Sequence, residues 1–136
     1  LCSVIKRVEH IGIAVKDISS STTLFEKLLG VKPYKTEKVL SEGVNTTFFR
    51  LSDQKIELLS SINKGSAIEK FLESKNEGIH HIALLVDSLE SEINRLEGLG
   101  FQFISKAPKE GADNKRIVFL HPKSTNGVLV ELCEEI

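Results

Sequence analysis

The chain has 136 residues, of which 40% are hydrophobic and 27% are charged, a balance typical of one folded globular domain. Its 18 basic and 19 acidic residues leave a formal net charge of -1, which argues against nucleic acid or an anionic membrane as the main partner. Two cysteines, Cys2 and Cys133, are too few for a secreted fold held by disulfides, and no apolar run reaches the roughly 20 residues that span a bilayer. We therefore expect a water-soluble protein of a reducing compartment.

In the first half of the chain, the pattern predicts one strand, one helix and three further strands. Residues 8–15 predict the first strand, and an apolar pattern of helical spacing ends at Gly30, which fits a helix C-cap. Three short strand candidates follow, over residues 31–40, 44–51 and 55–60.

A connecting helix and a second copy of the same pattern follow. Ser66 and Glu69 have the spacing of a capping box and predict a helix over about 65–75. The second copy then has a strand over 79–86, a helix that ends before Gly100, and strand candidates over 101–105, 115–120 and 127–133.

The two copies align residue by residue, which is the most informative feature of the sequence. Residues 8–15 superimpose on residues 79–86, and each is followed by an acid, a serine-containing helix start and an apolar helical pattern. We therefore predict an α+β domain over residues 1–136, built from two tandem βαβββ modules at about 7–62 and 78–134.

The repeat also aligns polar residues that interrupt apolar strands. His10 matches His81, and Glu57 matches Glu131, with separations of 47 residues in the first copy and 50 in the second. Imidazole and carboxylate together suit a borderline divalent metal and can leave coordination positions open for a substrate. A lone strand histidine is usually satisfied by an ordinary hydrogen bond, but four residues at matching positions favour a joint metal site.

Strand alternation decides which of two adjacent histidines belongs to this set. His81 shares its face with Ala83, as His10 does with Gly12, whereas His80 points the other way and is expected to be structural. The small residues Gly12 and Ala83 leave space on that face. Glu131 shares its face with two apolar residues, so its charge would be expensive to bury without a cation.

Three further basic residues are candidates for substrate binding. His121 and Lys123 lie in a turn, and Lys115 lies at the start of a strand. Loops carry function, so His121 and Lys123 could contact a ligand, but a solvated loop is an equally open interpretation. Lys115 could meet a phosphate of a ligand, although charges of this kind mostly face solvent. No residue is assigned to an organic cofactor.

Several short motifs of the chain match those of a known protein family, and the resemblance extends from Val8 to Glu131. The chain resembles the vicinal oxygen chelate superfamily and, within it, the methylmalonyl-CoA epimerases. The narrower resemblance rests on residues 78–83 (GIHHIA), on residues 55–59 (KIELL), and above all on residues 119–124 (FLHPKS) followed by residues 127–132 (GVLVEL).

The resemblance implies a cupped mixed sheet around a divalent metal, often cobalt, with zinc, nickel, manganese or magnesium as other choices. It implies that His10, Glu57, His81 and Glu131 are the metal ligands and that the enzyme interconverts the 2R and 2S forms of methylmalonyl-CoA, a small CoA thioester. Glu131 and Glu57 are the candidate bases. Some members also place a catalytic glutamate where ungapped matching puts Thr46, so one base remains open. A homodimer is implied, in the cytoplasm or, in a eukaryote, in the mitochondrial matrix.

Other functions of the same superfamily remain open. Glyoxalase I-type lactoylglutathione lyases use the same four ligand types, although they usually show an aspartate-proline-aspartate-glycine turn where this chain has His121-Pro122-Lys123. An iron site of the extradiol dioxygenase kind is disfavoured because the fourth position is an acid. A metal-free small-molecule-binding relative would be expected to have lost these ligands.

Overall fold

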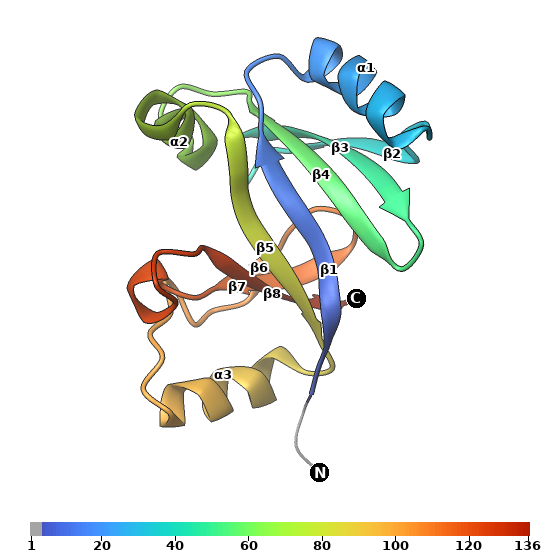
Figure 1. Ribbon diagram of the computed structural model, residues 1–136. Helices are drawn as coiled ribbons and strands as arrows, with labels where there is room; N and C mark the ends of the chain where they lie inside the picture. Colours follow the sequence, from blue (N-terminus) through green and yellow to red (C-terminus); the bar gives the residue numbers. More distant parts are fainter. Residues whose placement is uncertain (1–3) are drawn as a thin grey trace. The chain divides into compact units, whose positions relative to one another are not determined.

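The computed structural model describes residues 4–136, which form two compact units. The first unit is His10–His80; the second comprises residues 4–9 together with His81–Ile136. Strands β1 (Ile5–Ala14) and β5 (Gly78–Val86) each contribute to both units (Figure 1). Among the described residues, no helix is both long and apolar enough to cross a lipid bilayer.

The first unit holds a mixed sheet with strand order β2-β3-β4-β1. Strands β2/β3 and β3/β4 pair antiparallel, whereas β4 and β1 pair parallel. Its other elements are α1 (Ile18–Leu29), β2 (Lys35–Val39), β3 (Val44–Leu51), β4 (Gln54–Ser61) and α2 (Ala67–Lys75).

The second unit repeats this arrangement, with β5, β8, β7 and β6 in the places of β1, β4, β3 and β2. Strands β5 and β8 pair parallel, and β7 pairs antiparallel with both β8 and β6. The elements are α3 (Leu89–Gly98), β6 (Lys109–Glu110), β7 (Lys115–Phe119), a 3-10 turn (Pro122–Ser124) and β8 (Val130–Glu135). The predicted α+β class and the repeated βαβββ pattern are thus both present.

The strand predicted over residues 101–105 is wrong. Phe103 makes only an isolated bridge with Leu120, and the edge strand of this unit is β6 at Lys109–Glu110. The bridge has two backbone bonds, from the His121 amide to the Gln102 carbonyl at 2.8 Å and from the Ile104 amide to the Phe119 carbonyl at 2.9 Å. The Gln102 amide donates instead to Ser124 Oγ at 2.9 Å, in the turn after β7, so the pairing ends at this single bridge.

Helix ends follow the sequence closely, with two small differences. Gly30 caps α1 in the left-handed conformation (φ 72°), which glycine adopts without steric cost. At α3 the cap residue is Leu99, and Gly100 takes the positive φ one residue later. At α2, Ser66 Oγ accepts from the Glu69 amide as predicted, but the Glu69 carboxylate accepts from the Gly65 amide instead of that of Ser66.

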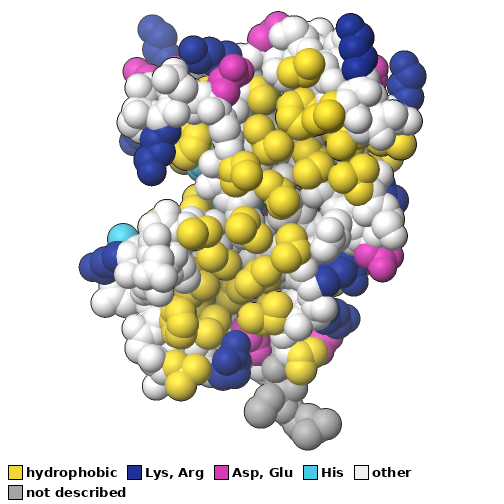
Figure 2. Space-filling view, in the orientation of Figure 1, with side chains coloured by type: hydrophobic (Ala, Val, Ile, Leu, Met, Phe, Trp, Pro, Cys, Tyr) yellow, Lys and Arg dark blue, Asp and Glu magenta, His cyan; other side chains and the backbone are white. Residues whose placement is uncertain are grey.

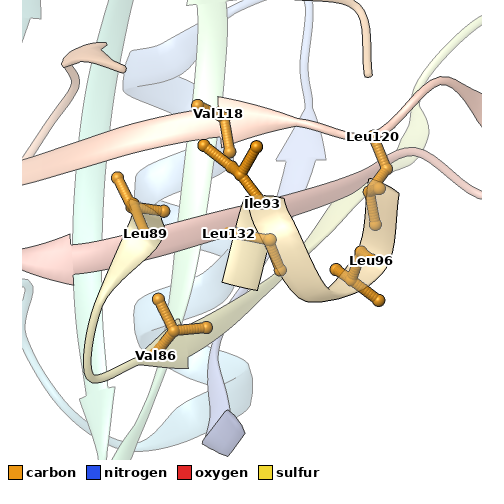
Figure 3. Packing of buried hydrophobic residues seen from close by; sticks show 7 residues of the cluster. All are labelled: Val86, Leu89, Ile93, Leu96, Val118, Leu120 and Leu132. Carbon is orange, nitrogen blue, oxygen red and sulfur yellow. The ribbon is translucent and has the colours of Figure 1, made fainter. Parts of the chain in front are cut away.

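Each unit buries its helix against the sheet face opposite the predicted ligands. In the first unit, Phe25 and Leu29 of α1 pack on Phe49 and Leu58. In the second, α3 packs on β7 and β8 (Figure 3), and the buried cluster consists of Val86, Leu89, Ile93, Leu96, Val118, Leu120 and Leu132. Cys133 is also buried, and Cys2 lies outside the described residues.

Truncation of Leu132 tests this core. Leu132 is fully buried, so Leu132→Ala leaves a cavity and should lower the free energy of unfolding by about 2 to 5 kcal/mol. Val128→Ala is the matched control, because Val128 is 43% exposed and its truncation should cost less than about 0.5 kcal/mol. Urea denaturation followed by circular dichroism measures both, and equal losses in the two variants would contradict the assigned core.

Candidate metal centre

In the first unit, the parallel strands β1 and β4 bring His10 and Glu57 together. Glu57 lies directly opposite Gly12 in the strand register, and His10 shares that face of β1 two residues earlier. Because Gly12 has no side chain, the carboxylate can lean across it, and His10 Nε2 lies 3.1 Å from Glu57 Oε1. Both residues are buried.

The second unit repeats this pair on β5 and β8. Glu131 lies opposite Ala83, and His81 Nε2 lies 3.4 Å from Glu131 Oε1. Both residues are again buried, so Glu131 does not project into solvent, as its apolar neighbours on the strand predicted. Each unit therefore supplies one imidazole and one carboxylate at equivalent places.

A phenylalanine stands beside each glutamate on the same face, which the sequence had not suggested. Phe48 is the register partner of Glu57, and Phe119 is that of Glu131. The Phe119 ring meets the His81 ring edge-on, with centroids 6.0 Å apart. Their matching positions in β3 and β7 were the signal that could have revealed them.

The donor atoms fit a divalent cation. A cation that holds a histidine nitrogen and a carboxylate oxygen at about 2.1 Å, with an angle of about 90 to 110° between them, sets the two atoms about 3.0 to 3.4 Å apart. The two pairs have these separations, 3.1 Å and 3.4 Å. Nitrogen and carboxylate donors together are suited to zinc, cobalt, nickel and similar ions.

His80 lies outside this set, as strand alternation predicted. Its ring packs edge-on against Phe71 of α2, with centroids 4.9 Å apart and an interplanar angle of 83°. It is a packing residue of the first unit.

The three predicted substrate-binding residues lie in three different environments. Lys115 is buried on the same face of β7 as Phe119, and its Nζ donates to the Asp113 carbonyl at 3.0 Å. His121 is half-buried, and its Nδ1 accepts from the Lys123 amide at 3.2 Å, which leaves the neutral ring's proton on Nε2. The Lys123 side chain is exposed.

Lys123 lines a separate surface pocket of about 510 Å³, formed by the end of α3 and the 3-10 turn. The pocket's lining residues include no histidine and no glutamate. The structure therefore places Lys115 on the glutamate-bearing face, whereas Lys123 belongs to a different surface.

Thr46, where the resemblance left one base open, has a hydroxyl group and no carboxylate. It is buried in β3, and its hydroxyl donates to the Glu37 carbonyl at 2.9 Å. Glu37 itself lies on β2, opposite Thr46 in the register.

The chain is similar to known proteins of one superfamily. Residues 9–119 match the family model described as the glyoxalase/bleomycin resistance protein/dioxygenase superfamily. The chain belongs to this superfamily. An uncharacterized Bacillus subtilis protein, YqjC, is 41% identical over 128 residues, which are 94% of this chain and 91% of that protein.

Other relatives within the superfamily carry a functional name. Mitochondrial methylmalonyl-CoA epimerase of Dictyostelium discoideum is 39% identical over 132 residues, or 96% of this chain and 80% of that protein. The crystal structure of methylmalonyl-CoA epimerase from Mycobacterium tuberculosis has a TM-score of 0.93 at 30% identity and covers 97% of this chain and 89% of that one. The fold is thus that of the superfamily.

The adjacent histidines of β5 give a matched test of metal binding. His81→Ala removes a predicted ligand and should weaken cobalt binding by at least about tenfold, whereas His80→Ala, on the opposite face, should leave it within about twofold. Calorimetric titration of the metal-stripped protein measures both affinities. Equal affinities in the two variants would argue against His81 as a ligand.

Proposed function

We propose that this protein is a metal-dependent epimerase that interconverts the 2R and 2S forms of methylmalonyl-CoA. The observation that carries this proposal is the buried His–Glu pair found at equivalent places in both units. Membership of the superfamily and the relatives named methylmalonyl-CoA epimerase support it.

In this proposal His10, Glu57, His81 and Glu131 together hold one divalent cation, with cobalt as the first choice. Buried carboxylates are costly unless a positive charge compensates them, so four buried donors of these types indicate a cation. When bound, a divalent cation polarises the thioester carbonyl and makes the hydrogen at C2 of the acyl group more acidic.

The two glutamates are proposed to move the proton. Inversion at C2 requires that a proton leaves one face of the planar carbon and arrives at the other, which two bases on opposite sides achieve most simply. A carboxylate that binds a cation through one oxygen keeps a second oxygen for this purpose. Glu131 is the first candidate base, and Glu57 is the second.

Substrate contacts form a further part of the proposal. The Nε2–H of His121 can donate to a polar group of the thioester, because Nδ1 is already engaged by the Lys123 amide. Lys115 adds a positive charge on the glutamate-bearing face of the second unit. Lys123, which lines its own pocket, is assigned to a distant part of the CoA moiety.

In this proposal residues 1–136 form one domain, with modules at about 7–62 and 78–134. The protein acts as a homodimer. It works in the cytoplasm or, in a eukaryote, in the mitochondrial matrix. Exposed hydrophobic side chains in both units support self-association (Figure 2), since Leu28, Leu40 and Leu99 are 71%, 76% and 67% exposed. Light scattering coupled to gel filtration measures the assembly, and we expect twice the chain mass.

A parallel assay tests the reaction. After reconstitution with cobalt, the protein should epimerise (2S)-methylmalonyl-CoA and should leave the methylglyoxal–glutathione hemithioacetal unchanged. Chiral analysis of the CoA ester and absorbance of the lactoylglutathione product provide the two measurements. Turnover of the hemithioacetal alone would replace this proposal with a glyoxalase I-type lyase.

Deuterium exchange tests the two bases. In heavy water, Glu57→Gln and Glu131→Gln should each slow incorporation at C2 of one epimer by about a hundredfold or more. Rates are referred to the measured metal content, because both residues are also proposed ligands. Glu26→Gln in α1 is the control and should exchange at the wild-type rate; a glutamine variant that matches this control would exclude that glutamate as a base.

A further inference from the structure

A polar groove lies between α1 and the outer strands of the first unit (Figure 1), and it has no role in the proposal so far. Helix α1 packs on β3 and β4, and the groove occupies the remaining space between the start of α1 and the edge strand β2. Its volume is about 600 Å³, within the range of small-molecule sites. Its lining includes Thr22, Thr36, Lys38, Asn45 and Thr47, and we call it the hydroxyl groove.

Two cross-strand pairs form the floor of the hydroxyl groove. Thr36 is the register partner of Thr47, and Lys38 is the register partner of Asn45. Phe49, two residues after Thr47, packs against α1, so strand alternation places both pairs on the helix-facing side of the sheet. The groove therefore lies on the face opposite to the His–Glu pair of this unit.

The hydroxyl of Thr47 is the observation that points to a ligand. Thr47 is only 2% exposed, and its Oγ1 lies 3.4 Å from Thr22 Oγ1, longer than the usual hydroxyl–hydroxyl distance of about 2.7 Å. A valine would fill the same space without the cost of burying a polar group. Because a hydroxyl can donate one hydrogen bond and accept two, both threonines keep capacity for a bound molecule.

The charge of the groove comes from Lys38. This lysine is exposed, and its side chain is on the helix-facing side of β2. Glu37 also borders the groove, but it is the register partner of Thr46 and belongs to the opposite face, where its carboxylate lies 3.5 Å from Lys35 Nζ. The helix-facing side therefore favours a ligand with one anionic group.

The lining indicates which ligand chemistry fits. Threonine hydroxyls and the Asn45 amide both donate and accept hydrogen bonds, as the hydroxyls of a sugar require, and the Lys38 ammonium suits a phosphate. None of the described residues that line the groove is aromatic, so it offers no ring on which a nucleobase could stack. The lining thus matches a sugar and a phosphate better than a base.

We propose that the hydroxyl groove binds a phosphorylated ribose. The sugar hydroxyls bond to Thr22, Thr47 and Asn45, and Lys38 binds the phosphate at the rim. A free sugar phosphate and the 3′-phosphorylated ribose of CoA both carry this chemistry. The inference does not rest on the proposed function, because the groove is on the other side of the sheet from His10 and Glu57.

Ribose 5-phosphate is the probe for the groove. A nuclear magnetic resonance titration of the intact purified protein measures its affinity and should shift the amide signals of Asn45 and Thr47. Thr47→Val removes the hydroxyl and should weaken binding about three- to tenfold, as expected for the loss of one hydrogen bond. Thr47→Ser keeps the hydroxyl and is the matched control, with an affinity within about twofold of the wild type.

A lysine variant tests the phosphate end without touching a buried position. Lys38→Met should weaken ribose 5-phosphate about three- to tenfold and leave the weaker binding of ribose within about twofold. Lys75→Met, at an exposed position of α2 outside the groove, is the control and should change neither affinity.

CoA and dephospho-CoA separate the two sources of the ligand, because they differ only in the ribose 3′-phosphate. Tighter binding of CoA than of dephospho-CoA, with the difference lost in Lys38→Met, would identify CoA as the source. Equal affinities of these two compounds, together with binding of ribose 5-phosphate, would identify a free sugar phosphate.

Three results would overturn the proposal. The first is that neither ribose 5-phosphate nor CoA shifts the groove amides at concentrations of up to about 10 mM. The second is an affinity for these compounds that is unchanged in both Thr47→Val and Lys38→Met. The third is inorganic phosphate that binds as tightly as ribose 5-phosphate, which would leave an anion site without sugar recognition.

Discussion

The candidate site depends on one packing relation, a glutamate placed opposite a residue with little or no side chain across a parallel strand pair. Glu57 faces Gly12, and Glu131 faces Ala83. The space beside each glutamate lets its carboxylate reach the histidine two residues earlier on the neighbouring strand. A larger residue at position 12 or 83 would occupy that space, and the two donors would no longer approach each other.

In both units, the burial of the His–Glu pair determines what chemistry the pair can support. Each pair is nearly inaccessible to water and has a phenylalanine as register neighbour, so its charge must be balanced from within the protein or by a bound ion. Helices α1 and α3 pack on the opposite face of these strands. Stability and function are thus assigned to different faces of the same strands.

The sequence was a good guide wherever a feature was periodic or repeated. Alternation separated His81 from His80, and duplication paired His10 with His81 and Glu57 with Glu131, because these signals are local and occur twice. It was a poor guide at residues 101–105, where pairing with the end of β7 stops at the single Phe103–Leu120 bridge and the Gln102 amide bonds to the Ser124 side chain instead. The burial of Lys55 was equally hidden, because it depends on which strand lies beside β4 and on where Tyr34 places its ring.

The repeat is imperfect at the neighbours of the paired residues. The residue two positions after the paired phenylalanine is Arg50 in the first unit and His121 in the second. The residue two positions before the paired glutamate is Lys55 in the first unit and Leu129 in the second. The same imidazole and carboxylate therefore stand beside a different set of charges in each copy, so duplication has kept the donor atoms alike while their local electrostatic fields have diverged.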